Sequence, residues 1–325
     1  MINLLAVAAV LSMVTADKIC PDTTLIKAPC KFVEVANIKC AIECDSGVAL
    51  DLVAMFKALQ TSLKAEEKTF VRFVLKNYKI TELPANVFAD ILFDAIIIED
   101  STSLKKIHSA AFNGGAYRVK RLDIINTPVN EATVGSDLFA AIQSLPNLAN
   151  LRLIKTNLTM IPASAIKSMN ELMHIYIEQN KALKIIGHNA FMNLPKLKTL
   201  EIKDNAAIEK ILYTAFPISS VASKDPLEIR LIADHLTYDS LVATTFDAIN
   251  RPVNLYVTDN GFQYIKQSIF EGFVKQNPLN VIISDTDCED TNNDWLRKTY
   301  PKQWNDVNCF GLMNAQARLF KGLRL

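Results

Sequence analysis

Short segments with two apolar residues flanking a variable one recur along most of the chain, 23 to 29 residues apart. They are Phe73/Leu75, Ile96/Ile98, Leu122/Ile124, Leu151/Leu153, Ile175/Ile177, Leu200/Ile202, Ile229/Leu231 and Leu255/Val257, with a ninth pair at Val281/Ile283. This alternation predicts a short strand with one buried face at each pair. A repeat of this length indicates stacked structural units.

A second apolar signal follows about ten residues after each pair, where two apolar residues lie five positions apart. These steps are Leu83 to Phe88, Ile107 to Phe112, Val134 to Phe139, Ile161 to Ile166, Ile186 to Phe191, Ile211 to Phe216, Leu241 to Phe246 and Ile265 to Phe270. One turn of chain cannot bury both the strand and the Phe, whereas stacked turns can. The pattern predicts an α/β solenoid with a parallel sheet on its concave side, a spine of stacked Phe rings, and a convex side of loops and short helices.

Polar residues at the bend after each strand are predicted to bond to the loop backbone as a ladder. In the later repeats these residues are Asn180, Asn205, Asp234 and Asn260. The first four repeats have Tyr78, Ser101, Thr127 and Thr156 in this position. We therefore expect a less regular N-terminal half.

The segments "LMHIYIEQNKALKIIGHNAF" (172–191) and "LKTLEIKDNAAIEKILYTAF" (197–216) resemble extracellular-type leucine-rich repeats. The "IGHNAF" variant is also similar to the arthropod secreted proteins labelled Oplophorus-luciferin 2-monooxygenase non-catalytic subunit. The resemblance covers residues 70–286 as repeats. It implies a leucine-rich-repeat horseshoe with cysteine-bearing caps at 17–69 and 287–325, and an accessory role beside an enzyme.

The N-terminal sequence "MINLLAVAAVLSMVTA" has an eleven-residue apolar core and ends in small residues, although it has no Lys or Arg before the core. It predicts a signal peptide at residues 1–16 and a secreted, extracellular protein. No other apolar run reaches the roughly 20 residues of a membrane span. The final segment "NAQARLFKGLRL" is too charged for a lipid-anchor signal.

All six cysteines lie outside the repeats, four before them and two after. They are Cys20, Cys30, Cys40, Cys44, Cys288 and Cys309. In a secreted solenoid an even number of cysteines favours disulfides over a metal site. The first group resembles the N-terminal cap of the repeat family. Three pairings of these four are open, of which we favour Cys20–Cys40 with Cys30–Cys44. The rear pair encloses Trp295, Leu296 and Trp304, which are expected to cover the last turn.

Two further features bear on partners. Asn157-Leu158-Thr159 is the only N-x-S/T sequence, so Asn157 is either a glycosylation site or an unmodified loop residue. The net charge of +1 provides no concentrated basic surface, which argues against nucleic acid as a partner.

A catalytic or metal site requires groups that converge in space, and the best candidate cluster is His174, Glu178 and Glu201. It has one imidazole and no nucleophile. His108, His188 and His235 fall at loop or bend positions. We therefore expect no metal, no cofactor and no enzymatic activity.

The residues between and just after the buried apolar pairs should share the concave face. In the middle of this face they mix both charges with aromatic rings, and Tyr and Arg are enriched in binding hot spots. The predicted partner-binding residues are Asp123, Arg152, Tyr176, Glu178, Glu201, Lys203, Arg230 and Tyr256. A structural or matrix-type repeat protein without one specific ligand is the alternative.

Overall fold

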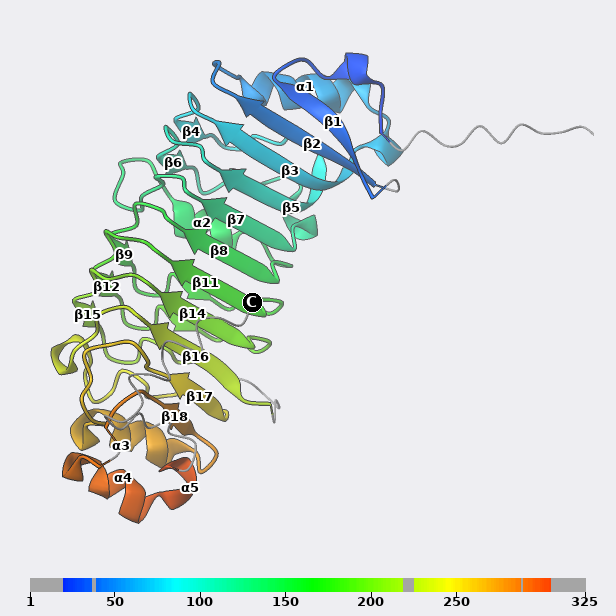
Figure 1. Cartoon of the computed structure of the whole chain (residues 1–325). Coiled ribbons are helices and arrows are strands. Elements are labelled where there is room, and N and C mark those ends of the chain that lie inside the picture. Colours follow the sequence, from blue (N-terminus) through cyan, green and yellow to red (C-terminus); the bar gives the residue numbers. More distant parts are fainter. Residues whose placement is uncertain (1–19, 37–38, 219–224, 288, 305–325) are drawn as a thin grey trace, which may run out of the picture.

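A computed structural model describes residues 20–36, 39–218, 225–287 and 289–304. Its main feature is an eleven-stranded sheet that forms one side of a curved solenoid (Figure 1). Neighbouring strands pair in parallel except at the N-terminal hairpin. The prediction of a leucine-rich-repeat solenoid with a parallel sheet is confirmed, and we call the solvent-facing side of this sheet the concave face.

The strands of the main sheet, in spatial order, are β1 (Cys30–Val35), β2 (Lys39–Ser46), β3 (Thr69–Asn77), β5 (Leu92–Glu99), β7 (Arg121–Ile125), β8 (Asn150–Ile154), β11 (His174–Glu178), β14 (Thr199–Lys203), β16 (Leu227–Ile232), β17 (Val253–Tyr256) and β18 (Val281–Ile283). Shorter strands outside this sheet are β4 (Glu82–Leu83), β6 (Lys106–Ile107), β9 (Met160–Ile161), β10 (Ile166–Lys167), β12 (Ile185–Ile186), β13 (Phe191–Met192) and β15 (Lys210–Ile211). The α-helices are α1 (Leu52–Ser62), α2 (Leu138–Gln143), α3 (Gln267–Gln276), α4 (Asp294–Thr299) and α5 (Pro301–Trp304). Single 3-10 turns are η1 (Thr23–Leu25), η2 (Ala65–Glu67), η3 (Ala116–Arg118), η4 (Tyr238–Ser240) and η5 (Thr291–Asn293).

The apolar pairs form the inner face of the sheet, and in the first eight pairs each residue is at most 1% exposed. The ninth prediction is wrong by one residue. Ile282 is fully buried and pairs with Leu255, whereas Val281 and Ile283 are half-exposed. Because Val281, Ile282 and Ile283 are all apolar, this segment has no alternation from which the buried position could be inferred.

The predicted Phe spine forms in two blocks. Phe88 stacks on Phe112, with ring centroids 6.2 Å apart. Phe191, Phe216, Phe246 and Phe270 continue from ring to ring at 5.7 to 6.0 Å. Each stacked pair adds about 0.5 to 1.5 kcal/mol beyond its area burial.

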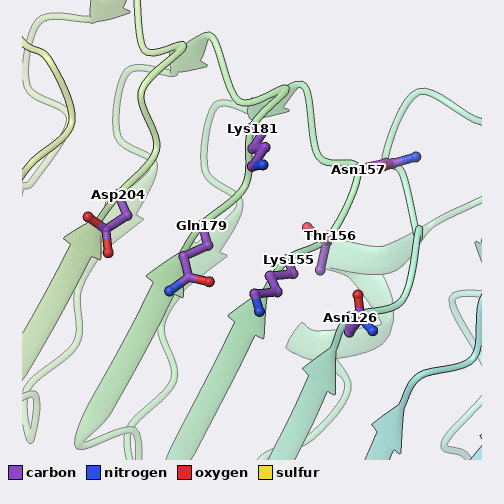
Figure 2. A pocket seen from close by; sticks show the side chains of 7 residues that line it. All are labelled: Asn126, Lys155, Thr156, Asn157, Gln179, Lys181 and Asp204. Atoms are coloured by element: carbon purple, nitrogen blue, oxygen red, sulfur yellow. The ribbon is translucent and has the colours of Figure 1, made fainter.

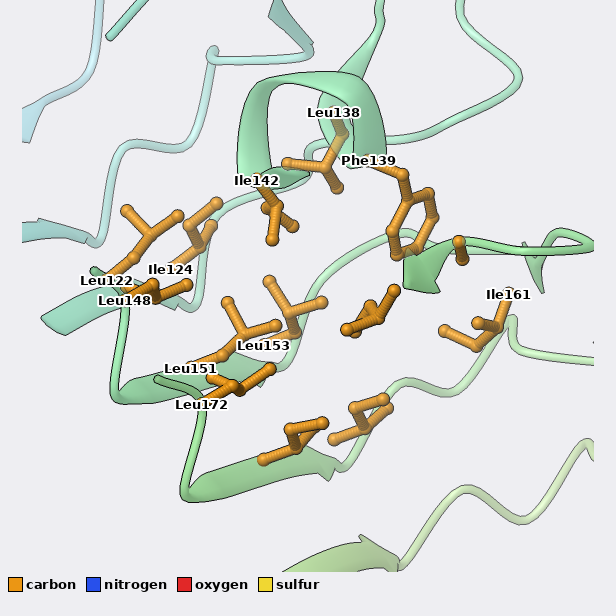
Figure 3. Packing of buried hydrophobic residues seen from close by; sticks show 14 of the residues in the cluster. Leu122, Ile124, Leu138, Phe139, Ile142, Leu148, Leu151, Leu153, Ile161 and Leu172 are labelled. Atoms are coloured by element: carbon orange, nitrogen blue, oxygen red, sulfur yellow. The ribbon is translucent and has the colours of Figure 1, made fainter. Parts of the chain in front are cut away.

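Between these blocks the repeat differs from the predicted frame. Val134 is 88% exposed, so its assignment to the core is wrong. Helix α2 begins four residues after Val134, and its side chains Leu138, Phe139 and Ile142 pack into the core against the strands (Figure 3). A helix buries residues at a spacing of three or four, so the five-residue step no longer marks the core here.

The polar ladder runs along the ends of the strands. Asn180 Oδ1 accepts a hydrogen bond from the Thr156 backbone N–H at 2.8 Å, and Asn205 Oδ1 accepts one from Asn180 at 2.9 Å. Ser101 and Thr127 make equivalent rungs through their hydroxyl groups, and the sheet remains continuous. The sheet therefore shows no break in the N-terminal half.

The first rung differs from prediction, because Asn77 and not Tyr78 occupies it. Asn77 is fully buried, whereas Tyr78 is 41% exposed. In the later repeats a residue with positive φ, such as Asp100 or Asn126, turns the chain before the ladder residue. No positive φ is recorded at Lys76, so β3 continues straight into Asn77 and the ladder residue comes one position earlier.

Disulfides and helices close the N-terminal end of the stack. The bonds Cys20–Cys40 and Cys30–Cys44 are present, which confirms the favoured pairing, and the second joins directly opposite residues of β1 and β2. Helix α1 is capped at its N-terminus by Asp51, whose side chain accepts a hydrogen bond from the Ala54 N–H, and the helix buries Phe56 against the first Phe rings.

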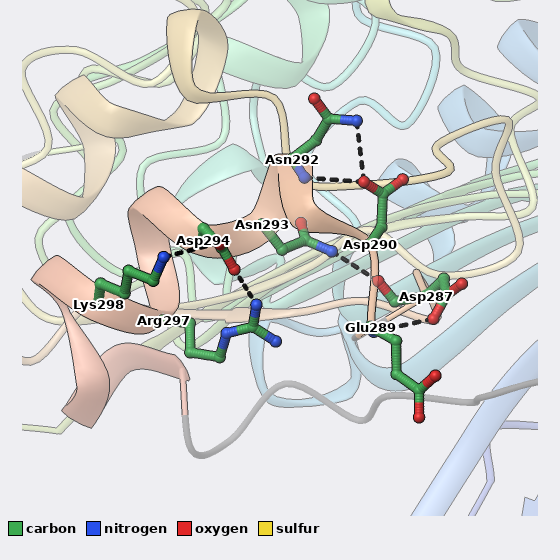
Figure 4. A network of polar contacts seen from close by, with 8 residues as sticks. All are labelled: Asp287, Glu289, Asp290, Asn292, Asn293, Asp294, Arg297 and Lys298. Carbon is green, nitrogen blue, oxygen red and sulfur yellow. Dashed lines mark hydrogen bonds and ion pairs between the residues drawn. The ribbon is translucent and has the colours of Figure 1, made fainter.

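The C-terminal end is covered by α3, α4 and α5. Trp295 Nε1 donates to the Ile265 carbonyl at 2.7 Å, and Leu296 is fully buried. A polar network from Asp287 to Lys298 fixes the turn before α4, and within it Asn293 donates to the Asp287 carbonyl (Figure 4). Cys288, Cys309 and the predicted signal peptide lie outside the described residues. Within the described ranges, no helix is long and apolar enough to cross a membrane.

Candidate protein-binding surface

Six of the eight residues predicted to bind a partner stand directly opposite one another on neighbouring strands. This central row is Asp123, Arg152, Tyr176, Glu201, Arg230 and Tyr256. The other two, Glu178 and Lys203, are opposite each other in the adjacent row. Side chains two apart on a strand point to the same face, so both rows belong to the concave face.

Asp123 is covered rather than exposed. Its carboxylate is 1% exposed and accepts hydrogen bonds from Arg121 Nε at 3.1 Å and Arg121 Nη2 at 2.6 Å. Arg152 Nη1 lies 3.5 Å from the same carboxylate. The hydrogen bond to Asp123 raises the pKa of Arg121. Asp123 was predicted to contact a partner directly, but its carboxylate is buried beneath these arginines. Its role at this surface is therefore to hold the side chains of Arg121 and Arg152 in place.

Arg230 is also held by neighbours. Its Nη2 lies 2.7 Å from Glu228 and its Nη1 lies 3.6 Å from Glu201. The guanidinium carbon is 4.9 Å above the centre of the Tyr256 ring. Burial lowers the pKa of Arg230, but the hydrogen bond to Glu228 and the nearby carboxylates outweigh it and raise the pKa. These contacts fix the cation in place before a partner arrives.

Glu178 is a half-buried carboxylate without a hydrogen bond or ion pair in the part of the chain that the structure describes. Burial raises its pKa, and the negative charge of Glu201 raises it further, although Arg152 and Lys203 act in the opposite direction. Perturbed groups of this kind cluster at functional sites. Glu178 and Lys203, directly opposite each other, are the two charged residues of the predicted surface whose side chains have no hydrogen bond or ion pair in the described structure.

The alternative catalytic cluster does not converge on one point. Tyr176 lies between His174 and Glu178 on β11, and its ring stacks on His174 with centroids 6.4 Å apart. Burial and the charge of Lys198 lower the pKa of His174, and its buried Nδ1 atom has no partner among the described groups. Across the described ranges, no three His, Cys, Asp or Glu side chains are placed to hold a metal ion.

An open hollow of about 610 Å³ lies at the ends of the strands, next to the row that contains Glu178 and Lys203 (Figure 2). Asn126, Lys155, Gln179 and Asp204 line it from four successive strand ends, all with positive φ. The sequence prediction did not include these residues. They could have been found in the sequence by their position, because each comes immediately before a ladder residue. Asn and Asp, present at two of the four positions, tolerate the left-handed backbone conformation required there.

A second feature outside the predicted partner-binding set is an aliphatic strip on the N-terminal part of the concave face. Val74 lies opposite Ile97, and Ile125 lies opposite Ile154. Val74, Ile97 and Ile125 are half-exposed, and Ile154 is 7% exposed. The sequence places these residues on the concave face, but they have neither charge nor aromatic ring and so were not among the predicted partner-binding residues.

Asn157 is exposed, and Figure 2 shows its side chain directed away from the row of strand ends. His188 lies outside the main sheet, where its ring stacks on Tyr213 at 5.1 Å. Neither residue contributes to the two concave rows.

Comparisons with known proteins agree with this architecture. The leucine rich repeat family matches residues 146–206, which include β8, β11 and β14. The thyrotropin receptor of the pig (Sus scrofa) is 26% identical over a 148-residue alignment, which covers 39% of this chain and 19% of the receptor. The chain thus spans about a fifth of that relative's length. The solenoid, the matched repeats and the receptor similarity together support a leucine-rich-repeat protein.

Proposed function

We propose that this chain is a secreted recognition module that binds a protein partner through the concave face and has no catalytic activity of its own. The main support for this proposal is the central row, in which adjacent strands of one sheet align Arg152, Tyr176, Glu201, Arg230 and Tyr256. Tyr and Arg are the residues most enriched in hot spots, and a rigid sheet loses little entropy on binding. A face of this kind can present the roughly 800 Å² that a specific complex buries on each partner.

Secretion is part of this proposal. Support comes from the four described cysteines, which all form disulfides, since such bonds persist in oxidising compartments. An accessory role beside an enzyme is what the resemblance to the arthropod proteins suggests. Asn157 is the proposed glycosylation site, and its exposed side chain is consistent with that role.

The test is a binding measurement with a partner recovered by pull-down from the native extracellular fluid. Tyr176→Ala and Arg230→Ala should each weaken binding by about 2 kcal/mol, roughly thirtyfold, as for a hot-spot residue. Lys167→Ala is the control, because Lys167 is exposed on β10 outside the main sheet. Thermal melts establish that all three variants fold.

Unchanged binding for both concave variants, with a loss for Lys167→Ala, would place the interface on the convex side. Weak binding to many proteins with no effect of any variant would favour the structural alternative.

A further inference from the structure

The aliphatic strip and the acidic part of the concave face meet at β8 and β11. Ile154 lies directly opposite Glu178, and it also lies opposite Ile125 on its other side. Neighbouring strands are about 4.8 Å apart, so apolar and acidic side chains are adjacent here. Tyr176 and Glu201 lie opposite each other in the next row.

The charges on this face differ in how far the protein itself satisfies them. Asp123 is neutralised by Arg121 and Arg152, and Arg230 by Glu228 and Glu201. The Glu178 carboxylate has no such partner among the described residues, although it lies directly opposite Lys203. Glu201 is reached by a cation only at 3.6 Å. A cation from outside would therefore find two carboxylates and one aromatic ring, flanked by Arg152 and Lys203.

The exposed aliphatic residues are a separate observation that points to the same ligand. Val74, Ile97 and Ile125 leave apolar surface open on the concave face, outside the buried core of the solenoid. Burying such surface against a partner stabilises a complex by about 25 cal/mol per Å². An occupant must therefore offer an apolar group over Ile125 and Ile154 and a basic group beside Glu178, which lies one strand from Ile154 and two from Ile125.

We propose, building on the concave binding function, that the partner presents a segment with an apolar side chain next to a Lys or Arg. The apolar side chain packs on Ile97, Ile125 and Ile154. The basic group enters beside Tyr176 and bonds to Glu178 and Glu201. Arg is favoured over Lys, because its planar guanidinium can stack on the Tyr ring and bond to two carboxylates.

The experiment uses three capped dipeptides, acetyl-Leu-Arg-amide, acetyl-Leu-Gln-amide and acetyl-Leu-Glu-amide. Each is titrated into the full-length protein with labelled Ile methyl groups, and binding is read from the shifts of Ile125 and Ile154. We expect saturable shifts with affinity in the order Arg, Gln, Glu. Glu178→Gln should weaken the Arg peptide about threefold, as for a half-exposed ion pair, and leave the Gln peptide unchanged. Glu201→Gln should act in the same direction.

The matched control is Glu209→Gln, which removes an exposed carboxylate paired with Lys184 away from the main sheet. It should leave all three affinities unchanged. Three results overturn the inference: no shift of the concave Ile methyls at tens of millimolar peptide, an affinity independent of peptide charge, or shifts centred on Ile185. Failure here is distinguishable from failure of the proposed function. A partner whose binding needs Tyr176 and Arg230 but tolerates Glu178→Gln would retain the concave interface and exclude the basic anchor.

Discussion

Asp234 is a carboxyl group in a position that the neighbouring repeats fill with an amide. Its Oδ1 accepts hydrogen bonds from the backbone and side-chain N–H groups of Asn205 at 2.8 and 3.1 Å. Its Oδ2 is buried and has no partner in the described structure. In the next repeat the equivalent Asn260 Nδ2 donates to the Leu231 carbonyl at 2.7 Å. An ionised Asp234 cannot donate in this way, whereas Asn at this position could donate to the equivalent carbonyl, that of Ile202.

The expected effect of Asp234→Asn depends on pH. Burial, and to a lesser extent the charge of Asp204, raises the pKa of Asp234 from 3.8 to about 7, although the hydrogen bonds from Asn205 oppose this change. A raised pKa means that the folded protein prefers the protonated acid. The stabilisation is complete below the unfolded-state pKa and is lost as the pH rises through about 7. The variant should therefore gain about 3 kcal/mol in unfolding free energy over wild type between about pH 4.5 and about pH 8.

The assay is urea unfolding of both proteins, with disulfides intact, at half-unit steps over this pH range. The difference in unfolding free energy should rise by about 1.4 kcal/mol per pH unit near pH 6 and level off above pH 8. Asp239→Asn is the control, because it removes an exposed carboxylate from the same repeat and should show no such trend. A constant difference between wild type and Asp234→Asn across the range would refute the buried-acid interpretation.

Three further predictions concern the frame and its modifications. Phe191→Ala should lower the unfolding free energy by about 3 to 5 kcal/mol, because it removes a fully buried ring from the stacked spine. His188→Ala, whose ring stacks on a tyrosine outside the main sheet, should cost about 1 kcal/mol or less by the same denaturation assay, and equal effects would contradict this register. Thiol labelling of the unreduced, denatured protein should modify no cysteine, whereas two labelled sites would show that Cys288 and Cys309 are not bonded. Expression in a eukaryotic secretory host should give a glycan that Asn157→Gln removes, and a wild-type mass that deglycosylation leaves unchanged would exclude this site.

The repeat frame could be predicted from sequence because strict alternation and a recurring Phe define both sides of each turn. The prediction was wrong at three places in this frame. Val281, Ile282 and Ile283 form a continuous apolar run, and pairing with β17 rather than alternation decides which of them is buried. Val134 lies in an exposed turn before helix α2, which supplies the buried residues of this repeat, and at Tyr78 the straight end of β3 moves the ladder by one residue.

The candidate surface could be predicted only as a set of positions. Parallel strands in register bring every residue between two buried apolar neighbours onto one face, so Tyr176 and Arg230 were correctly placed there. The pairing of their charges depends on side-chain conformations that the sequence does not specify. For this reason the burial of Asp123 beneath Arg121 was not foreseen.

The internal ion pairs and the unpaired carboxylate have opposite consequences for binding. Arg230 is already held by Glu228 and by the Tyr256 ring, so little side-chain entropy remains to be lost when a partner contacts it. Glu178 instead has an electrostatic cost in the free protein, because its charge is half-buried beside that of Glu201. A basic partner group relieves this cost, whereas an acidic one increases it. Under the proposed binding function, the paired residues provide a rigid surface and Glu178 discriminates between basic and acidic partner groups, because like charges brought together oppose association.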